Sequence, residues 1–460
     1  MLPGTALGVL VGDLAYTVMA VRLARRTGRD DVTAMPFGID TPTLFAMVFG
    51  VLGPVKLATG DPVLAWKVGM AVTIAIGAVK CLLSFAGDWA RRVVPRAALL
   101  GSIAGVAILL IAFLPMLKIV RDPLVGLVAL VVLLVALVGG VRMPFGVPGA
   151  VAAVAAGALV FWLRASLGLG DHRIPAAGAD LTLAIPWPTL AWLAAVDDAL
   201  PYLSIALPFA LVTIVGGIDN TESAAAAGDT YRTRDILLVE AVATVLTGLC
   251  GGVIQNTPYI GHPAYKAMGA RAGYTLATGL AIGGGAVVGA LGALVAVLPE
   301  AAVAPILVFI GLEITAQAFM ASPARHGAAV ALAFVPVAAA VVLILLDGVL
   351  SALGRSAADL AGDAGATYRA LLVLGNGFIL TAVLWSSALV FIIERRPAPT
   401  AVAFGLCGAA TLCGLVHSPL PSGAVFWPWS AHAPLAVAAP LAGAYATLTA
   451  LALLLAGRSR

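Results

Sequence analysis

Charge is scarce in this sequence of 460 residues, because aspartate, glutamate, lysine and arginine together make up only 10% of the chain. A soluble domain of ordinary composition carries about 25% charged residues, and this scarcity excludes a chain built mainly of soluble domains. Apolar residue types amount to 62%, and the mean hydropathy is +1.07. The composition therefore predicts an all-α integral membrane protein that crosses the bilayer many times.

Cysteine and histidine are also few, with four and five copies. The cysteines lie singly within apolar stretches and form no CxxC pair, so neither a disulfide framework nor a zinc site is indicated. The net charge of +4 does not point to nucleic acid, because basic residues in a membrane protein mostly mark its cytoplasmic loops. We predict no metal, no cofactor and no nucleic-acid partner.

Apolar stretches long enough to cross a bilayer of about 30 Å follow one another along the chain. Full spans are predicted at 3–21, 63–86, 97–117, 123–140, 148–166, 204–227, 235–254, 273–298, 302–320, 327–350, 368–392, 399–416 and 434–456. Two shorter pieces, 42–57 and 262–270, each follow a polar stretch rich in proline and glycine, and these look like discontinuous spans. In the longest connection, PTLAWLAAVDDALPYL predicts an interfacial helix.

The two polar stretches resemble each other. Placing MPFGIDTPTLFAM (35–47) over TPYIGHPAYKAM (257–268) matches prolines, aromatic residues and methionines, including Pro36 with Pro258 and Pro42 with Pro263. Seven predicted crossings separate the copies, so they run in opposite directions and form an inverted repeat, an architecture of many secondary transporters. Since proline removes donors that a continuous helix needs, we expect each copy to be extended and then helical, and the two to face each other antiparallel.

A second polar motif, GGIDNTESAAAAGD (216–229), continues the span that starts near residue 204. Asp219, Glu222 and Ser223 are spaced at i, i+3 and i+4 and would share one helix face. Carboxylates inside a membrane are costly and usually functional, which makes Asp219 a site candidate. The alternative is that the helix ends at Ile218 and both acids face the cytoplasm near Arg232 and Arg234.

These motifs carry a family resemblance: over roughly residues 1–393 the chain resembles a divergent member of the xanthine/uracil permease family (nucleobase:cation symporters, nucleobase/ascorbate transporter-like). The resemblance implies a seven-plus-seven span inverted-repeat transporter fold with core and gate domains. It also implies a substrate held between two half-spans, here 35–47 and 255–268. In that family a carboxylate on the first helix of the second repeat holds the nucleobase, a place that Asp219 occupies here.

The chain departs from that family pattern at several places. Gln255, Asn256 and Thr257 precede a proline where many members have Q-N-x-G, and Gly261 followed by His262 stands where a second carboxylate is common. The domains expected are 1–167 for the first repeat, 168–203 for the extramembrane connection, 204–393 for the second repeat and 394–460 for two additional spans. The first repeat is expected to be one span short; a start codon assigned too late would explain this, and a genuine loss is the alternative.

The candidate site residues come from both half-spans and from the motif at 216–229. Substrate-binding candidates are Phe37, Gly38, Asp219, Glu222, Ser223, Asn256, Thr257, Tyr259 and Gly261; proton-coupling candidates are Asp219, His262 and Asp40. Each has a structural alternative. Phe37 and Tyr259 could be core aromatics, His262 and Asp40 could cap helices, and the polar residues of 256–257 could satisfy the broken backbone.

Taken together, the sequence predicts a secondary active transporter of the bacterial inner membrane that couples protons, or another ion, to a small-molecule substrate. The expected substrate is a nucleobase-like metabolite or another small planar or anionic metabolite. The expected partners are the lipid bilayer, in which the chain lies, and a second copy of the chain in a homodimer. The alternative of the same fold is an anion exchanger or uniporter. A non-transport intramembrane enzyme is disfavoured, because the single GxGD match, at 168–171, lies outside every predicted span and no GxSG occurs.

Overall fold

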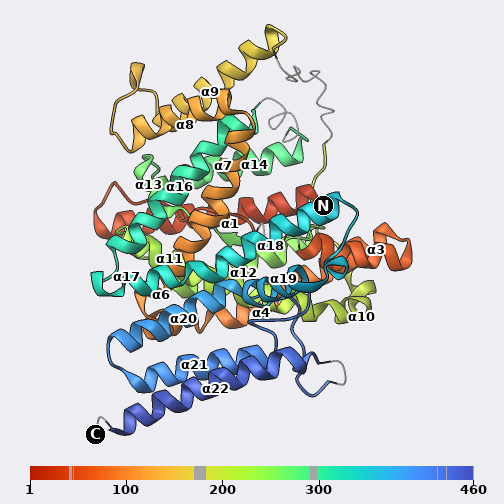
Figure 1. Ribbon diagram of the computed structural model, residues 1–460. Helices are drawn as coiled ribbons and strands as arrows, with labels where there is room; N and C mark the ends of the chain where they lie inside the picture. Colours follow the sequence, from red (N-terminus) through yellow and green to blue (C-terminus); the bar gives the residue numbers. More distant parts are fainter. Residues whose placement is uncertain are drawn as a thin grey trace.

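The computed structural model describes residues 1–40, 44, 46–169, 183–290, 298–421, 423–430 and 433–458, and it is built almost wholly of helices (Figure 1). Among these residues seven helices are long and apolar enough to cross a membrane, or eight if one sharply bent pair counts as a span. The chain is therefore an integral, multi-pass membrane protein.

The elements follow the predicted spans closely. Up to residue 166 they are α1 (Leu2–Thr27), β1 (Phe37–Ile39), the π-helix η1 (Ala46–Leu52), α3 (Gly53–Thr59), α4 (Pro62–Ser84), α5 (Gly87–Val93), α6 (Arg96–Val106), the π-helix η2 (Ala107–Phe113), α7 (Leu114–Arg121), α8 (Pro123–Leu137), the 3₁₀ turn η3 (Pro144–Gly146) and α9 (Gly149–Ser166). From residue 191 they are η4 (Ala191–Ala195), α10 (Val196–Ala199), η5 (Leu200–Tyr202), α11 (Leu203–Ala226), α12 (Thr233–Leu249), β2 (Asn256–Pro258), α13 (His262–Ala267), α14 (Tyr274–Val287), α16 (Glu300–Met320), η6 (Ala324–His326), α17 (Gly327–Leu332), α18 (Phe334–Ala352), η7 (Ala357–Asp359), α19 (Gly362–Gly375), α20 (Phe378–Ile393), α21 (Pro397–Leu412) and α22 (Leu435–Arg458).

The two broken spans meet as predicted. Strands β1 and β2 pair antiparallel, with Phe37 opposite Pro258, Gly38 opposite Thr257 and Ile39 opposite Asn256. The ladder extends at one end through a hydrogen bond of 3.1 Å from the Asp40 N–H to the Gln255 carbonyl. Each strand is followed by helix, α13 after β2 and η1 with α3 after β1. The expected match of Pro42 with Pro263 lies outside the described residues.

The helices of the two halves pack in corresponding ways, as expected for an inverted repeat: the helix before each broken span packs on the helix after the other one. Helix α1 precedes β1 and packs on α14, which follows the other broken span; helix α12 precedes β2 and packs on α4, which follows the first. In the same way α16 packs on α6, α8 and α9, while α6 packs on α16, α18 and α20. This is the inverted-repeat fold of secondary transporters. Among the described residues of the first repeat, α11 has no counterpart.

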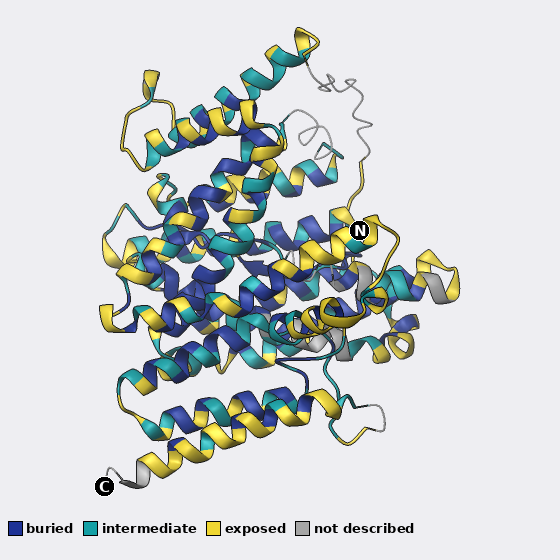
Figure 2. Ribbon diagram, viewed as in Figure 1, coloured by how far each residue is buried: buried dark blue, intermediate teal, exposed yellow. Residues whose placement is uncertain are grey.

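Two groups of helices result, in line with the expected core and gate domains. The strand group consists of α1, β1, η1, α3, α4, α11, α12, β2, α13 and α14. The flanking group consists of α6, η2, α7, α8, α9, α16, α17, α18, α19 and α20. Helix α11 belongs to the first group and also packs on α6, α16 and α20, and α13 packs on α16, so both helices lie at the boundary between the two groups. Figure 2 shows that buried residues concentrate in this central region.

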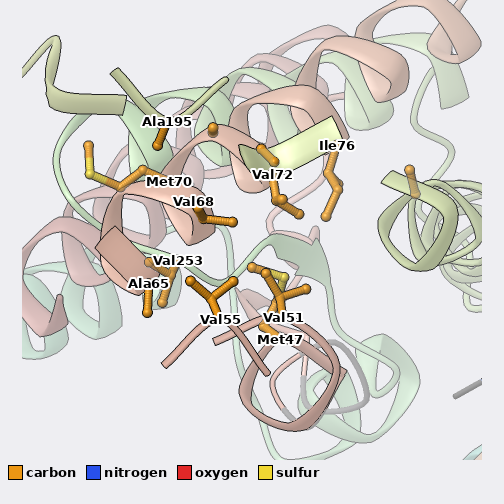
Figure 3. Close-up of a cluster of buried hydrophobic side chains, with 13 residues drawn as sticks. Met47, Val51, Val55, Ala65, Val68, Met70, Val72, Ile76, Ala195 and Val253 are labelled. Atoms are coloured by element: carbon orange, nitrogen blue, oxygen red, sulfur yellow. The ribbon is translucent and has the colours of Figure 1, made fainter. Parts of the chain in front are cut away.

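Packing behind the first broken span is apolar. Met47 and Val51 of η1 lie in one buried cluster with Val68 and Val72 of α4 (Figure 3), and Val253, just before β2, joins them. Each fully buried side chain of this kind contributes about 1.5–3 kcal/mol in an aqueous reference. In a bilayer the gain comes mainly from close contact rather than from water release. The cluster holds the helix after β1 against α4 and so helps to fix where β1 ends.

A stripe of glycines on one face of α1 lets this helix pack closely against both strands. Gly4, Gly8 and Gly12 recur every fourth residue and share one face, a spacing that lets helix backbones approach closely. A Cβ atom at Gly8 would lie 1.9 Å from Thr247 Oγ1, and one at Gly12 would lie 2.0 Å from the ring of Phe37. The stripe therefore sets the distance from α1 to α12 and β1.

Replacing Gly8 with alanine is expected to destabilise the protein by about 1–3 kcal/mol, the usual cost of forcing extra atoms into a packed interior. The added methyl also crowds the amide of Asn256, 2.5 Å from the Cβ position, so β2 shifts with it. The thermal midpoint in detergent measures this. Gly284→Ala is the matched control, because nothing lies within 4 Å of a Cβ at that position. Equal midpoints for the two variants would contradict the role of Gly8 in the close packing of α1.

The stretch predicted as one interfacial helix is helical from Ala191 to Tyr202, as the short elements η4, α10 and η5 in direct succession. One expectation about a single span was wrong. The span predicted at 368–392 is broken into α19 and α20, bent by 73°. Gly377 takes a φ of +71° at the break, and a Cβ there would lie 2.3 Å from the Leu415 carbonyl oxygen, so glycine is required.

The two C-terminal helices, α21 and α22, dock onto that break; α22 is long enough to be a span, and α21 is a shorter apolar helix. The Asn376 side-chain amide donates to the carbonyls of Ser418 (2.7 Å) and Leu420 (3.0 Å), which tie the loop after α21 to the bend. Beside it Tyr445 of α22 accepts a hydrogen bond from Trp385 of α20 and shares a second, of 2.7 Å, with His417. Helices α21 and α22 lie side by side along one edge of the molecule, against α20 (Figure 1).

Candidate functional site

The strand crossing brings together the candidates from both half-spans. Phe37 is buried and stacks edge-on against Tyr16 of α1, with ring centroids 5.1 Å apart. Gly38 lies under Tyr259, whose hydroxyl oxygen would be 2.2 Å from a Cβ at Gly38, so glycine makes room for the tyrosine. Phe37 therefore fills the core, and Tyr259, with 36% of its surface exposed, is the more accessible aromatic ring.

Asn256 and Gly261 serve the local backbone. The Asn256 amide donates to Thr247 Oγ1 at 2.7 Å, and its main-chain N–H donates to Thr244 Oγ1 at 3.2 Å, which ties β2 to α12. Gly261 has a φ of +146° and precedes α13, a conformation that side chains rarely adopt. The Thr257 side chain is buried opposite Gly38.

A fully buried ion pair lies directly behind β2. Lys80 of α4 pairs with Glu240 of α12, and both side chains have no exposed surface. The Lys80 ammonium also donates to Gln255 Oε1 at 3.1 Å and to the Asn256 carbonyl at 2.8 Å. Gln255 Oε1 accepts a further bond from Thr213 of α11, and its Nε2 lies 3.5 Å from Asp40 Oδ2. A charged centre thus links four elements at the strand crossing.

Helix α11 presents different polar residues to the two helix groups. Towards the strands, the Asn220 amide donates to the Pro258 carbonyl at 2.8 Å. Towards the flanking group, Asp219 accepts a bond from Ser102 of α6, and Ser223 donates to Gln317 of α16 at 2.7 Å. The prediction that Asp219, Glu222 and Ser223 share a face is confirmed. That face meets α6 and α16, and it is Asn220 that reaches β2.

Asp219 is buried and only partly satisfied. The alternative in which the helix ends at Ile218 is wrong, because α11 runs to Ala226 and leaves Asp219 with 1% exposure. Its Oδ2 accepts the Ser102 bond, while its Oδ1 is buried with no hydrogen-bond partner. Since a buried polar atom without a partner costs about 1–3 kcal/mol, this oxygen is available to a proton or to a ligand donor.

Glu222 differs, because it is fully paired. Arg91 of α5 and Arg96 of α6 each contact one of its carboxylate oxygens. The expected alternative partners, Arg232 and Arg234, are not the residues it meets. Glu222 thus closes the end of the boundary between α11 and α6 with an ion triad.

His262 belongs to a third cluster, away from the strands. Its Nε2 lies 3.0 Å from Asp229 Oδ2, the same oxygen that accepts from Lys266 at 2.8 Å and from the Thr33 N–H at 3.0 Å. Arg29 contacts the other oxygen at 3.1 Å. Burial alone would raise the pKa of Asp229, but hydrogen bonds from His262, Lys266 and Thr33 outweigh it and hold the pKa below its usual range.

Acid should weaken this cluster. Because the folded-state pKa of Asp229 is depressed, its stabilisation is present above the unfolded pKa of about 3.9 and is lost as the pH falls through the lower folded value. We expect the thermal midpoint of the wild type to be level above about pH 5 and to fall below about pH 4. Asp229→Asn should lower the free energy of unfolding at neutral pH by about 1.5–3 kcal/mol, seen as a lower midpoint, and its midpoint should fall less in acid. Parallel acid profiles for the two proteins would contradict this assignment.

The sequence interpretation missed Lys80, Glu240, Ser102, Asn220 and Gln255 as site residues. For Lys80 and Glu240 a signal exists, since each is a charged residue inside an apolar run, AIGAVKCLLS and ILLVEAVATV. The others are common polar residues whose importance appears only when α11 is seen between β2 and α6. Asp40 forms a helix-start bond from Leu44 N–H to its carbonyl, and a side-chain cap there would fall on residues outside those described.

No family model matches this chain, and no curated protein matches it. Thirty-nine chains of solved structures match it. One of them is the transmembrane domain of a cyanobacterium bicarbonate transporter, BicA, at 15% sequence identity and a TM-score of 0.40, with 83% of this chain and 97% of that chain covered. A likeness of this size carries no argument about activity or substrate.

Proposed function

We propose that this protein is a secondary active transporter that carries a small planar, nucleobase-like metabolite by proton symport. The observation that carries the proposal is the buried carboxylate of Asp219, with one oxygen unpartnered, on the helix between the strand group and the flanking group. Inverted-repeat transporters hold substrate near broken spans and expose it to either side when one group moves against the other.

The polar chemistry of this boundary favours a neutral ligand that bears N–H donors. An unpaired carboxylate oxygen attracts donors and repels anions, so Asp219 suits the N–H edge of a nucleobase better than a free carboxylate or sulfate. Ser102 donates to the other carboxylate oxygen, Oδ2. A ligand donor that approached Oδ2 would have to compete with the Ser102 hydroxyl for it. Tyr259, partly exposed above Gly38, supplies a ring on which a flat ligand can stack.

Coupling to protons requires a group whose charge changes during the cycle. Asp219 fits this role because its two oxygens are separate sites. A proton on Oδ2, shared with the Ser102 hydroxyl, leaves Oδ1 free to accept a ligand N–H, so proton and ligand can be bound together. His262 is the second candidate, since its Nδ1 is buried without a partner. Asp40, near the Gln255 amide, is the third.

An anion exchanger or uniporter of the same fold is the second candidate function. It is favoured by His262, which stands where a second carboxylate is expected. Such a protein would move an anion against a counter-anion without a proton gradient.

Uptake into proteoliposomes separates the two candidates. Purified protein should accumulate radiolabelled uracil or xanthine when the lumen is alkaline, and a protonophore should abolish the accumulation. Unlabelled nucleobases should compete, whereas small organic anions, bicarbonate and sulfate should not. Counter-flow of an anion that ignores the pH gradient would instead establish the exchanger, and the proton-symport proposal would be abandoned.

A further inference from the structure

We infer that the ammonium group of Lys80 occupies a small monovalent-cation site at the strand crossing, so that the protein carries a tethered cation where Na⁺ could otherwise bind. The inference concerns binding and stability at this place and does not depend on which substrate is transported.

The site is an oxygen cage, defined here as Glu240 Oε1, Gln255 Oε1 and the Asn256 carbonyl. All three lie around the Lys80 nitrogen, with the two neutral oxygens at 3.1 and 2.8 Å. Lys80, Glu240, Gln255 and Asn256 each have 0% exposure, so no water-filled surface competes for the ammonium. Such a set of carboxylate, amide and unwound backbone oxygens is the kind of ligand set that holds Na⁺ in transporters with broken spans.

The charge of the cage selects a monovalent ion. Of the three cage oxygens only Glu240 Oε1 carries a charge. The nearby Asp40 carboxylate contacts the Gln255 amide nitrogen rather than the Lys80 nitrogen, so one positive charge balances the cage itself. Burying an uncompensated charge is costly, and a divalent ion would leave one charge in excess. An ordinary lysine at a helix surface extends to water; this one points into the protein, and its nitrogen ends at the cage.

The carbonyl that binds the ammonium belongs to β2 itself. Asn256 pairs with Ile39 of β1, and Gln255 accepts the bond from Asp40. A cation in the cage therefore holds the crossing together from behind. Because the cation is covalently attached, its binding costs no loss of free-ion entropy and does not depend on the sodium concentration.

The experiment removes the tethered cation and offers a free one. Wild type and Lys80→Ala are purified in detergent with sodium chloride, exchanged into choline chloride, and melted over a series of NaCl, KCl and choline chloride mixtures at constant ionic strength. We expect the wild-type midpoint to be the same in all three salts. Lys80→Ala should melt lower in choline and recover in Na⁺ with a saturable rise of roughly 3–5 °C at a hundredfold excess over its dissociation constant.

The matched control is Lys80→Ala/Glu240→Ala, which removes the charged oxygen as well and should show no Na⁺ response. A wild type that is itself stabilised by Na⁺ in a saturable way would overturn the inference, and this measurement needs no variant. A folded Lys80→Ala protein with equal midpoints in Na⁺ and choline would also overturn it. So would failure to recover folded Lys80→Ala in sodium chloride, because Na⁺ should replace the missing ammonium.

Discussion

Asp219→Asn is expected to lower nucleobase uptake by about 10- to 150-fold and to remove its dependence on the pH gradient, while the protein remains folded. A hydrogen bond to a charged acceptor is worth about 1.5–3 kcal/mol, which corresponds to that range of affinity. Asparagine keeps the shape and can still accept from Ser102, but it cannot take up a proton and presents N–H₂ where the ligand needs an acceptor. Uptake at two lumenal pH values, in proteoliposomes of matched protein content, measures both effects.

Asp363→Asn is the control for this substitution, because Asp363 is an exposed aspartate in the first turn of α19. It should leave uptake unchanged. A thermal midpoint of Asp219→Asn within a few degrees of the wild type would show that the loss of uptake is not a loss of folding. If the Asp219→Asn protein retains pH-dependent uptake, Asp219 has no part in coupling or in substrate binding.

Glu240→Gln is expected to destabilise the fold by about 3–5 kcal/mol, the usual cost of removing one partner from a buried ion pair. The pair is fully buried between α4 and α12, and the substitution leaves the Lys80 ammonium with neutral oxygens only. The thermal midpoint in detergent measures the effect. Glu300→Gln is the matched control, because its ion pair with Lys118 is largely exposed and should contribute at most about 1 kcal/mol.

A double variant separates the loss of charge balance from the loss of packing. Lys80→Met/Glu240→Met carries no buried charge, and replacing a buried pair with apolar side chains is often neutral or stabilising. We expect its midpoint to lie well above that of Glu240→Gln. If Glu240→Gln melts no lower than Glu300→Gln, the buried pair does not hold α4 and α12 together.

The sequence was most informative where a pattern has a single physical reading. Long apolar runs must be spans, and proline-rich polar breaks such as those at 36–42 and 256–263 cannot continue a helix in lipid, so the membrane fold and the strand crossing could be predicted. The break between α19 and α20 could not, because Asn376 and Gly377 are stabilised there by a loop more than 40 residues later in the chain.

The candidate site was predicted only in part, for a similar reason. Spacing placed Asp219 and Ser223 on one face, but it could not tell which neighbouring helix that face meets. The charge at Lys80 was visible in the sequence, yet its partner depends on α4 and α12 packing side by side, which is a property of the whole repeat.

The bond network of Trp385, Tyr445 and His417 joins α22 to α20, and Asn376 joins the intervening loop to the same helix. These bonds attach the last two helices to the flanking group, so we expect any displacement between the two helix groups to carry them with it. Much of α22 is exposed (Figure 2), and its exposed side chains include Leu448, Leu451, Leu453, Leu454 and Leu455, which give this part of the molecule an apolar outer surface. A body with a longer lipid perimeter meets more viscous drag in the plane of the membrane, so under the proposed transport function we expect the strand group to be the half that moves and the flanking group, with α21 and α22, to be the half that stays in place.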